Sequence, residues 1–265
     1  MQISIHPTAI VDPGANLGEG IVVGPYTVID EDVAIGDGTV VGPHVHIGSG
    51  ARLGSYCRIH AGAVLAGVPQ DLKFNGEKTY LYIGDRTVVR ECVTLNRGTK
   101  ASGKTVIGSD NLIMAYVHTG HDCVIGNHVI IANSVSFGGH CEVGDYAFIG
   151  GLTGVHQFVR IGRYAMVGGV SRATLDVPPF VMAGGHDAFR YEGLNVIGLK
   201  RRGFTPEQIS LMKDAYRIIF QSGLLLSNAI EKVISEMPME PEIKEILDFF
   251  TAGSNGRKFL KPFKN

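Results

Sequence analysis

The sequence has no uninterrupted apolar run long enough to cross a membrane, and residues 1–14 show neither the basic start nor the apolar middle of a secretion signal. Cysteine is scarce, with 4 among 265 residues, and charged residues make up only 18% of the chain at a net charge of −1. This near-neutral balance gives no electrostatic reason to expect a nucleic acid partner. We therefore expect a cytoplasmic protein without a membrane span.

What the chain has in abundance is a six-residue repeat. An apolar, mostly aliphatic residue recurs at every sixth position from Ile5 to Val167, with one lapse at Thr119 and two interruptions. A second apolar or small residue stands two positions before each of them, which places both on one face of a short strand. Because a helix would repeat near every 3.6 residues, this spacing predicts a parallel β-helix whose coils share one core. The 36 glycines, many of which follow the apolar residue directly, are expected at corners where the backbone turns with positive φ.

The cysteines fit this arrangement. Cys57, Cys123 and Cys141 fall on the small inward positions, so we expect them to pack in the core. Cys123 and Cys141 are 18 residues apart and should stack, but a reducing compartment favours free thiols over a disulfide. Cys92 lies off the pattern and supports no prediction.

Two excursions interrupt the repeat, at residues 66–80 and 96–106. Both return in register, which indicates loops that leave otherwise intact coils, and long loops on a rigid scaffold commonly carry function. After Val167 the repeat dissolves. We predict a β-helix over residues 1–187 and a small all-α C-terminal domain over residues 188–265.

The C-terminal part carries clear helix signals. Thr205 is a typical N-cap residue, Pro206 is typical of the first helical position, and Gln208 is typical of the third. Two more amphipathic helices are predicted over residues 229–237 and 242–250. A unit of about 60 residues is small for independent stability, so we expect it to pack on the β-helix or on a neighbouring subunit.

The six-residue repeat resembles that of the hexapeptide acyltransferases, in which three hexapeptides form one coil of a left-handed β-helix. The resemblance implies the handedness, which opposes the usual right-handed preference of parallel crossovers. It also implies that residues 18 apart lie above one another at about 4.8 Å, the spacing of strands in a sheet. Neighbours in space can then be predicted from the sequence.

In this stacking, five polar residues converge on one edge of three successive coils: His118, His121, Asp122, His140 and His156. Imidazoles beside a carboxylate suit proton transfer near neutral pH. Two functions are open on this basis. Three histidines could bind zinc, as the β-helical γ-class carbonic anhydrases do at subunit boundaries, or one histidine could be a general base.

Longer motifs narrow the choice. They are the His-x-x-His-Asp of residues 118–122, the Pro-Gln-Asp-Leu-Lys of residues 69–73, the Val-His-Gln-Phe of residues 155–158 and the Gly-Leu-Lys-Arg-Arg-Gly-Phe of residues 198–204. Together they resemble the bacterial UDP-N-acetylglucosamine O-acyltransferases of lipid A synthesis over nearly the whole chain. The resemblance implies transfer of an (R)-3-hydroxyacyl group from acyl carrier protein to the sugar 3-hydroxyl of UDP-N-acetylglucosamine, without a metal or cofactor.

The resemblance also implies a role for individual residues. His121 matches the general base, Asp122 the carboxylate that orients it, and Gly139 the backbone N–H that stabilises the oxyanion. Met166 and Gly169 match the acyl-chain groove, where the missing side chain of Gly169 favours a long acyl chain. The substrate-contacting positions are Asp71, Lys73, His118, His140, His156, Gln157, Arg201 and Arg202, with the two arginines at the phosphate end.

Some positions depart from the family pattern. Asn96 stands where some members have histidine, and Ile197 stands where some have an acidic residue. Around His186 the resemblance is shifted by one residue, so no role is assigned there. The family resemblance further implies a homotrimer with active sites between neighbouring subunits.

Three other functions were weighed against this one. An N-acyltransferase of the same pathway would carry an additional N-terminal domain, for which a repeat that begins at Ile5 leaves no room. A zinc-dependent hydratase would need its metal held by histidines. A non-catalytic solenoid would explain the repeat but not the clustered histidines. The acyl length, and the choice between UDP-N-acetylglucosamine and a 3-amino analogue, stay open.

Overall fold

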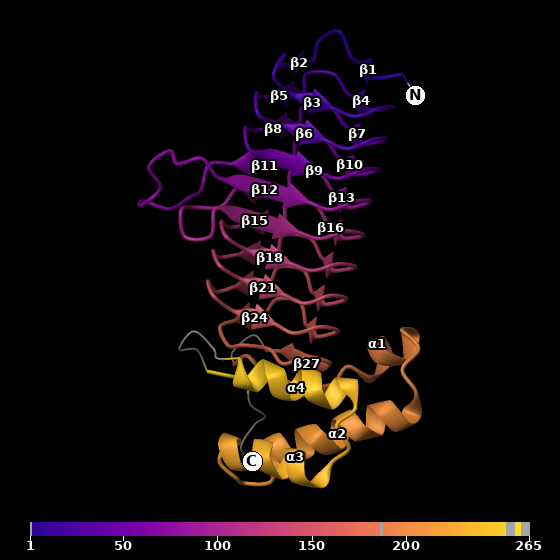
Figure 1. Ribbon diagram of the computed structural model, residues 1–265, viewed down its shortest axis with the longest axis vertical. Helices are drawn as coiled ribbons and strands as arrows, with labels where there is room; N and C mark the ends of the chain where they lie inside the picture. Colours follow the sequence, from indigo (N-terminus) through magenta and orange to yellow (C-terminus); the bar gives the residue numbers. More distant parts are fainter. Residues whose placement is uncertain (1, 186–187, 253–257, 261–265) are drawn as a thin grey trace.

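The computed structural model describes residues 2–185, 188–252 and 258–260, and most of the chain winds into a three-sided stack of short parallel strands (Figure 1). Each side is one sheet made of every third strand, except at the end of sheet A, where β27 and β28 follow β25. Sheet A consists of β1 (Ser4–Ile5), β4 (Val22–Val23), β7 (Val40–Val41), β10 (Arg58–Ile59), β13 (Val88–Val89), β16 (Leu112–Ile113), β19 (Ile130–Ile131), β22 (Phe148–Ile149), β25 (Met166–Val167), β27 (Val181–Gly184) and β28 (Arg190–Leu194). Sheet B consists of β2 (Ile10–Val11), β5 (Val28–Ile29), β8 (His46–Ile47), β11 (Val64–Gly67), β14 (Thr94–Asn96), β17 (His118–Thr119), β20 (Ser136–Phe137), β23 (Gly154–Val155) and β26 (Arg172–Ala173). Sheet C consists of β3 (Asn16–Leu17), β6 (Ala34–Ile35), β9 (Ala51–Leu53), β12 (Tyr80–Ile83), β15 (Lys104–Ile107), β18 (Val124–Ile125), β21 (Glu142–Val143) and β24 (Arg160–Ile161).

The coils stack with the predicted register. Ile113 pairs with Ile131, which pairs with Ile149, so that partners are 18 residues apart. All three side chains have 0% exposure and belong to one continuous aliphatic core. The three cysteines predicted to lie inward are buried free thiols, and Cys92 is exposed.

The glycines that follow the inward apolar residues have a different role from the predicted one. Positive φ occurs two positions later, mostly at residues other than glycine, such as Tyr146 (φ 61°) and Tyr164 (φ 55°). A Cβ on Gly24 would lie only 2.7 Å from the carbonyl carbon of Gly42 in the next coil. Close contact between coils therefore requires these glycines, and for them the predicted positive φ was wrong. For corner glycines such as Gly20 (φ 66°) and Gly38 (φ 65°) it was correct.

The corner between sheets B and C, called the BC corner, carries both excursions. Residues 68–79 lie between β11 and β12, and residues 97–103 lie between β14 and β15. In Figure 1 they are the two loops that protrude on the left of the stack. Beyond them β12 and β15 pair in register, with Ile83 opposite Ile107. Both loops therefore flank whatever lies on the BC corner.

Four helices follow the stack and lie at its last coils (Figure 1): α1 (Val196–Arg201), α2 (Pro206–Gln221), α3 (Leu226–Glu236) and α4 (Pro241–Thr251). The predicted start of α2 is correct, because Thr205 and Gln208 cap each other's backbone N–H. The Tyr216 hydroxyl donates to the carbonyl of Pro179 at 2.6 Å and fastens α2 to the stack. Helix α1 was not predicted.

The start of the predicted helical part is a strand rather than a helix. β28 covers Arg190–Leu194, within the range 188–265, and pairs antiparallel with β27. A strand at the end of a stack has unpaired backbone groups, and the returning chain satisfies them. His186 lies outside the described residues. In the described part of the chain, no helix is both long and apolar enough to cross a membrane.

Candidate active site

The structure brings the predicted polar cluster together at the BC corner. His118 lies on β17, and His121 and Asp122 follow that strand directly. His140 occupies the same corner one coil later, and His156 follows β23 one coil further. Asp122 and His140 both have a φ of 60°. Short polar residues tolerate this left-handed conformation better than most residues do.

His121 and Asp122 form the closest pair in this cluster. Nδ1 of His121 lies 2.7 Å from Oδ2 of Asp122, whose side chain has 0% exposure. A carboxylate only accepts hydrogen bonds, so Nδ1–H donates and Nε2 keeps its lone pair. Burial raises the pKa of Asp122, but hydrogen bonds from Ser102, His121 and Thr99 outweigh it and hold that pKa below its usual value. The pair thus presents an oriented proton acceptor.

Two further imidazoles flank this pair. His140 stacks on Phe158 with ring centres 4.5 Å apart, and its Nε2 lies 3.8 Å from Oδ2 of Asp122. Nδ1 of His118 lies 2.7 Å from the hydroxyl of Thr94. Burial lowers the pKa of His118, and for His140 burial lowers the pKa more than the charge of Asp122 raises it. Both rings are therefore suited to hydrogen bond uncharged polar groups at neutral pH.

Gly139 lies against the ring of His121. A Cβ on Gly139 would be 2.6 Å from Cε1 and 2.8 Å from Nε2 of that ring. Within the described residues, the backbone N–H of Gly139 donates to no acceptor. A free N–H beside the proton-accepting nitrogen is the arrangement that an oxyanion site requires.

Replacing Gly139 with alanine should therefore displace the His121 ring and lower kcat by roughly 100-fold, the cost of misplacing a catalytic group by about 1 Å. The thermal unfolding temperature of this variant should stay close to that of the parent protein, because the new Cβ displaces a side chain, the His121 ring, and not backbone atoms. Gly24→Ala is the matched control: its Cβ would meet the Gly42 backbone at 2.7 Å. It should lower the unfolding temperature and leave the kcat of the folded fraction intact. Full activity of Gly139→Ala would contradict this geometry.

The excursions add polar groups to the same corner. Asp71 lies close enough to His140 for its charge to raise the pKa of that ring, although burial has the larger, opposite effect. The backbone N–H of Lys73 donates to the Asp71 carboxylate at 3.0 Å, and the Lys73 side chain is exposed. His156 and Gln157 are exposed on the far side of the cluster, where Nδ1 of His156 lies 3.2 Å from the Gln157 carbonyl oxygen.

Four predicted site residues lie away from the BC corner. Met166 lies on β25 in sheet A, and Gly169 follows it at the corner between sheets A and B, the AB corner. Arg201 ends α1, and the Arg202 guanidinium lies 4.9 Å above the Tyr146 ring at the corner between sheets C and A, the CA corner. One chain therefore does not bring these residues to His121.

The contacts of the second excursion with Asp122 were not predicted from the sequence. Thr99 and Ser102 both donate to the buried carboxylate of Asp122. The only available signal was the pair of hydroxyl residues, Thr99 and Ser102, in a loop that leaves the BC corner one coil before Asp122. Of the two departures, Asn96 is buried with an amide nitrogen that has no partner among the described residues, and Ile197 is 66% exposed.

Within the described residues of one chain, no three histidines stand at metal-ligand spacing. In the described part of the chain, the group with metal-ligand spacing is His121, Asp122 and His140, whose ligand atoms lie within 4.8 Å of one another. The Asp122 oxygens in that group already accept hydrogen bonds from His121, Thr99 and Ser102. This donor set matches an oriented base better than a zinc site with three neutral imidazoles.

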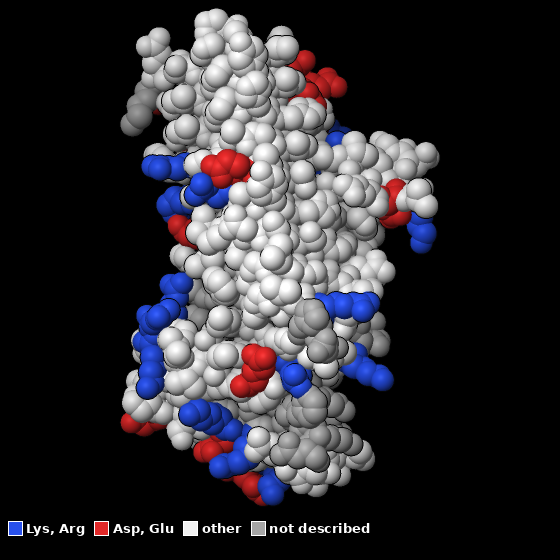
Figure 2. Space-filling model, turned by 180° about the vertical axis from the view of Figure 1, so that it is seen from behind, with Lys and Arg blue, Asp and Glu red and all other residues white. Residues whose placement is uncertain are grey.

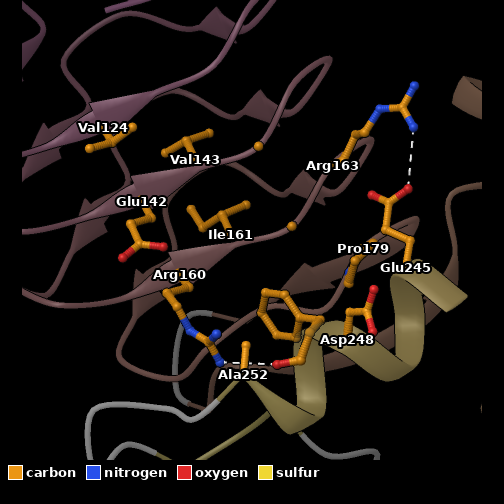
Figure 3. Close-up of a pocket in the computed structure, with 13 residues that line it drawn as sticks. Val124, Glu142, Val143, Arg160, Ile161, Arg163, Pro179, Glu245, Asp248 and Ala252 are labelled. Carbon is orange, nitrogen blue, oxygen red and sulfur yellow. Dashed lines mark hydrogen bonds and ion pairs between the residues drawn. The ribbon is translucent and has the colours of Figure 1, made fainter. Parts of the chain in front are cut away.

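A cavity of ≈ 460 Å³ lies elsewhere, between sheet C and α4 (Figure 3). Arg163 reaches Glu245 of α4 at 3.2 Å, and Arg160 donates to the Phe249 carbonyl oxygen at 3.2 Å. None of the predicted site residues lines it. These contacts fasten α4 to the stack.

Comparisons with known proteins point to one family. A model described as "Udp N-acetylglucosamine O-acyltransferase; Domain 2" matches residues 176–258, and the model "Bacterial transferase hexapeptide (six repeats)" matches residues 32–67 and 104–139. The acyl-[acyl-carrier-protein]–UDP-N-acetylglucosamine O-acyltransferases of Chlorobaculum parvum and Chlorobaculum tepidum are 78% and 80% identical to the chain over 262 residues, or 99% of either sequence.

Solved structures agree. The UDP-N-acetylglucosamine acyltransferase of Bacteroides fragilis has a TM-score of 0.93 at 43% identity, and that of Moraxella catarrhalis has 0.93 at 40% identity. Each match covers 97% of this chain and 99% of the other. Together with the hexapeptide match, they confirm the predicted fold class, a left-handed parallel β-helix followed by a helical C-terminal part.

Proposed function

Because the chain belongs to the acyl-[acyl-carrier-protein]–UDP-N-acetylglucosamine O-acyltransferase family, we propose that it moves an (R)-3-hydroxyacyl group from acyl carrier protein to the 3-hydroxyl of UDP-N-acetylglucosamine. This is the step that opens lipid A synthesis, and the proposal places it in the cytoplasm. The observation that carries the proposal is the His121–Asp122 pair at 2.7 Å, with the backbone of Gly139, whose N–H is free among the described residues, against the imidazole ring.

The chemistry follows from this pair. An alcohol is a poor nucleophile at neutral pH, so Nε2 of His121 removes the sugar hydroxyl proton as the oxygen attacks the thioester carbonyl. Asp122 stabilises the imidazolium, and the N–H of Gly139 donates to the oxyanion. Collapse of the tetrahedral intermediate forms the ester and breaks the C–S bond. The departing thiolate takes the proton from His121, which restores the base.

The flanking residues are proposed to hold the substrates. The neutral rings of His118 and His140 face groups of the sugar, and His156 and Gln157 extend this surface by one coil. Asp71 and Lys73 lie near the acyl hydroxyl and the nucleotide sugar. Arg201 and Arg202 hold the diphosphate, for which a guanidinium is well shaped.

We propose a homotrimer, because one chain distributes these residues over three corners. The outward positions of sheet A support it, since they form an apolar row in register: Val88, Leu112, Ile130, Phe148, Met166 and Met182. Figure 2, which views the molecule from behind, shows a broad band along the stack that is nearly free of charged side chains. A continuous row of partly exposed apolar side chains is commonly covered by a partner. A second copy placed there can bring Met166 and Gly169 to the BC corner of the first.

The test is to incubate the protein with UDP-N-acetylglucosamine and 3-hydroxyacyl carrier proteins of graded length, and to identify products by mass spectrometry. We expect an ester-linked product and the highest kcat/KM with chains clearly longer than about ten carbons. The reason is Gly169 at the AB corner, in the groove proposed for the acyl chain, because glycine has no side chain that would shorten this groove.

Other outcomes would overturn parts of this proposal. A preference for chains near ten carbons would contradict the groove, and the absence of any transfer would contradict the acyltransferase. Transfer only to a 3-amino analogue, giving an amide, would favour the N-acyltransferase. One tightly bound zinc per purified chain would favour the hydratase.

A further inference from the structure

The loop of residues 97–103 surrounds the carboxylate of Asp122 with donors. The backbone N–H of Thr99 lies 3.1 Å from Oδ1 and 3.2 Å from Oδ2, and its hydroxyl lies 2.7 Å from Oδ2. The N–H of Ser102 lies 3.2 Å from Oδ1, and its hydroxyl makes a short contact with the same oxygen. Only Oδ2 also reaches His121. The loop therefore determines how the carboxylate is turned toward the imidazole.

The loop is itself closed and rigid. The N–H of Gly103 donates to the Thr99 carbonyl oxygen at 2.7 Å, which ties the two ends of the turn together. A Cβ on Gly98 would lie 2.3 Å from the backbone nitrogen of Lys104, so the two arms of the loop touch. The hydroxyl of Thr105 accepts the backbone N–H of Asp122 at 2.8 Å. The hydroxyls of Thr99 and Ser102 are thus held in place before any substrate binds.

The Ser102 hydroxyl has one proton and two acceptors in reach. Besides Oδ1 of Asp122, the carbonyl oxygen of Lys104 lies 2.8 Å away. A hydrogen bond to an ionised group is roughly twice as strong as one between neutral groups, so the proton points to the carboxylate. Thr99 has no such conflict, because its hydroxyl accepts the N–H of Ala101 at 3.2 Å while it donates to Asp122.

We propose that Thr99 and Ser102 are positioning residues of the transfer reaction, which hold the Asp122 carboxylate in the orientation that keeps the proton of His121 on Nδ1. Nε2 is then always presented as the acceptor, and the carboxylate is in place when the imidazolium forms. This inference rests on the proposed function, because it assigns the two residues to the base of that reaction. Neither residue touches the reacting atoms, and both act through Asp122.

The test is the double variant Thr99→Val, Ser102→Ala, which removes both hydroxyls and keeps both backbone donors. We expect kcat to fall roughly tenfold, the low end of what losing an orienting partner costs, with KM for UDP-N-acetylglucosamine changed less than about twofold. Thr99→Ser and Ser102→Thr, which keep the hydroxyls, should retain most of the activity. Nitrogen-15 spectra of histidine-labelled protein without substrate, with His121 assigned from His121→Gln, should show one Nδ1–H tautomer in the parent and a mixture in the double variant.

Thr39→Val is the control for losing a buried hydroxyl, because Thr39 has 0% exposure and donates to the Gly54 carbonyl oxygen far from the BC corner. It should leave kcat and the spectrum unchanged. If the double variant fails to fold, Ser102→Ala alone replaces it, with the same expectations at a smaller effect. A kcat within twofold of the parent, or an unchanged tautomer, overturns the inference. Absence of turnover in the parent would instead contradict the proposed function, while the spectra would still report on the tautomer.

Discussion

Replacing His121 with alanine should lower the rate of acyl transfer by roughly 10²–10⁴-fold, the usual contribution of a general base. The residue lies on the BC corner outside the aliphatic core, so the fold should persist. The free N–H of Gly139 would remain, so some transfer above background should survive. Initial rates with a 3-hydroxyacyl carrier protein measure the loss, and circular dichroism with thermal unfolding measures the fold.

His128→Ala is the matched control for this variant. His128 is half-buried like His121 and stacks on Tyr146 with ring centres 4.7 Å apart, but it lies at the CA corner. Its removal should cost packing and leave kcat near that of the parent. Near-normal kcat in His121→Ala would remove that residue as the base. An equal loss in both variants would mean that general disruption, rather than base removal, explains the result.

The stack could be predicted because every coil repeats the same local pattern. The six-residue period predicts the strands, and the resemblance to the hexapeptide acyltransferases implies three hexapeptides per coil, which places Ile131 over Ile113. The same register places His140 one coil beyond Asp122, so the central cluster followed from the winding alone. The role of the glycines was harder to predict, because both a positive φ and close contact between coils favour glycine. Only the three-dimensional structure shows which of the two reasons applies at a given position.

Features that do not repeat could not be predicted in this way. The loop of residues 97–103 leaves the register, so the period says nothing about where Ser102 lies. β28 forms because the last coil has an unpaired edge, a property of the whole stack rather than of residues 190–194. Met166 lies on sheet A and Arg202 at the CA corner, away from His121. The packing of one copy against another, which would bring them together, is not encoded in a repeat within one chain.

Replacing Asp122 with asparagine should be as damaging as losing the base, with a fall in kcat of about 10³–10⁴-fold. The carboxylate oxygens accept from Thr99, Ser102 and His121, and all of these partners are donors. An amide has one oxygen and one NH₂ group, so the NH₂ group, itself a donor, must lie against a group that also donates. If the oxygen faces the loop, the NH₂ faces Nδ1 of His121 and drives its proton to Nε2, where it blocks proton abstraction.

Asp110→Asn provides the comparison for that result. Asp110 has the same backbone conformation, with a φ of 59°, and pairs with Arg86 at 2.7 Å, but it lies at the CA corner. It should keep parental turnover, because its charge has no part in orienting the base. Single-turnover rates would measure chemistry in both variants, and nitrogen-15 spectra would show whether the proton of His121 has moved to Nε2 in Asp122→Asn. If Asp122→Asn turned over normally with its proton still on Nδ1, the carboxylate would not orient the base, and His121 would have to be oriented by its packing against Gly139 and His140 alone.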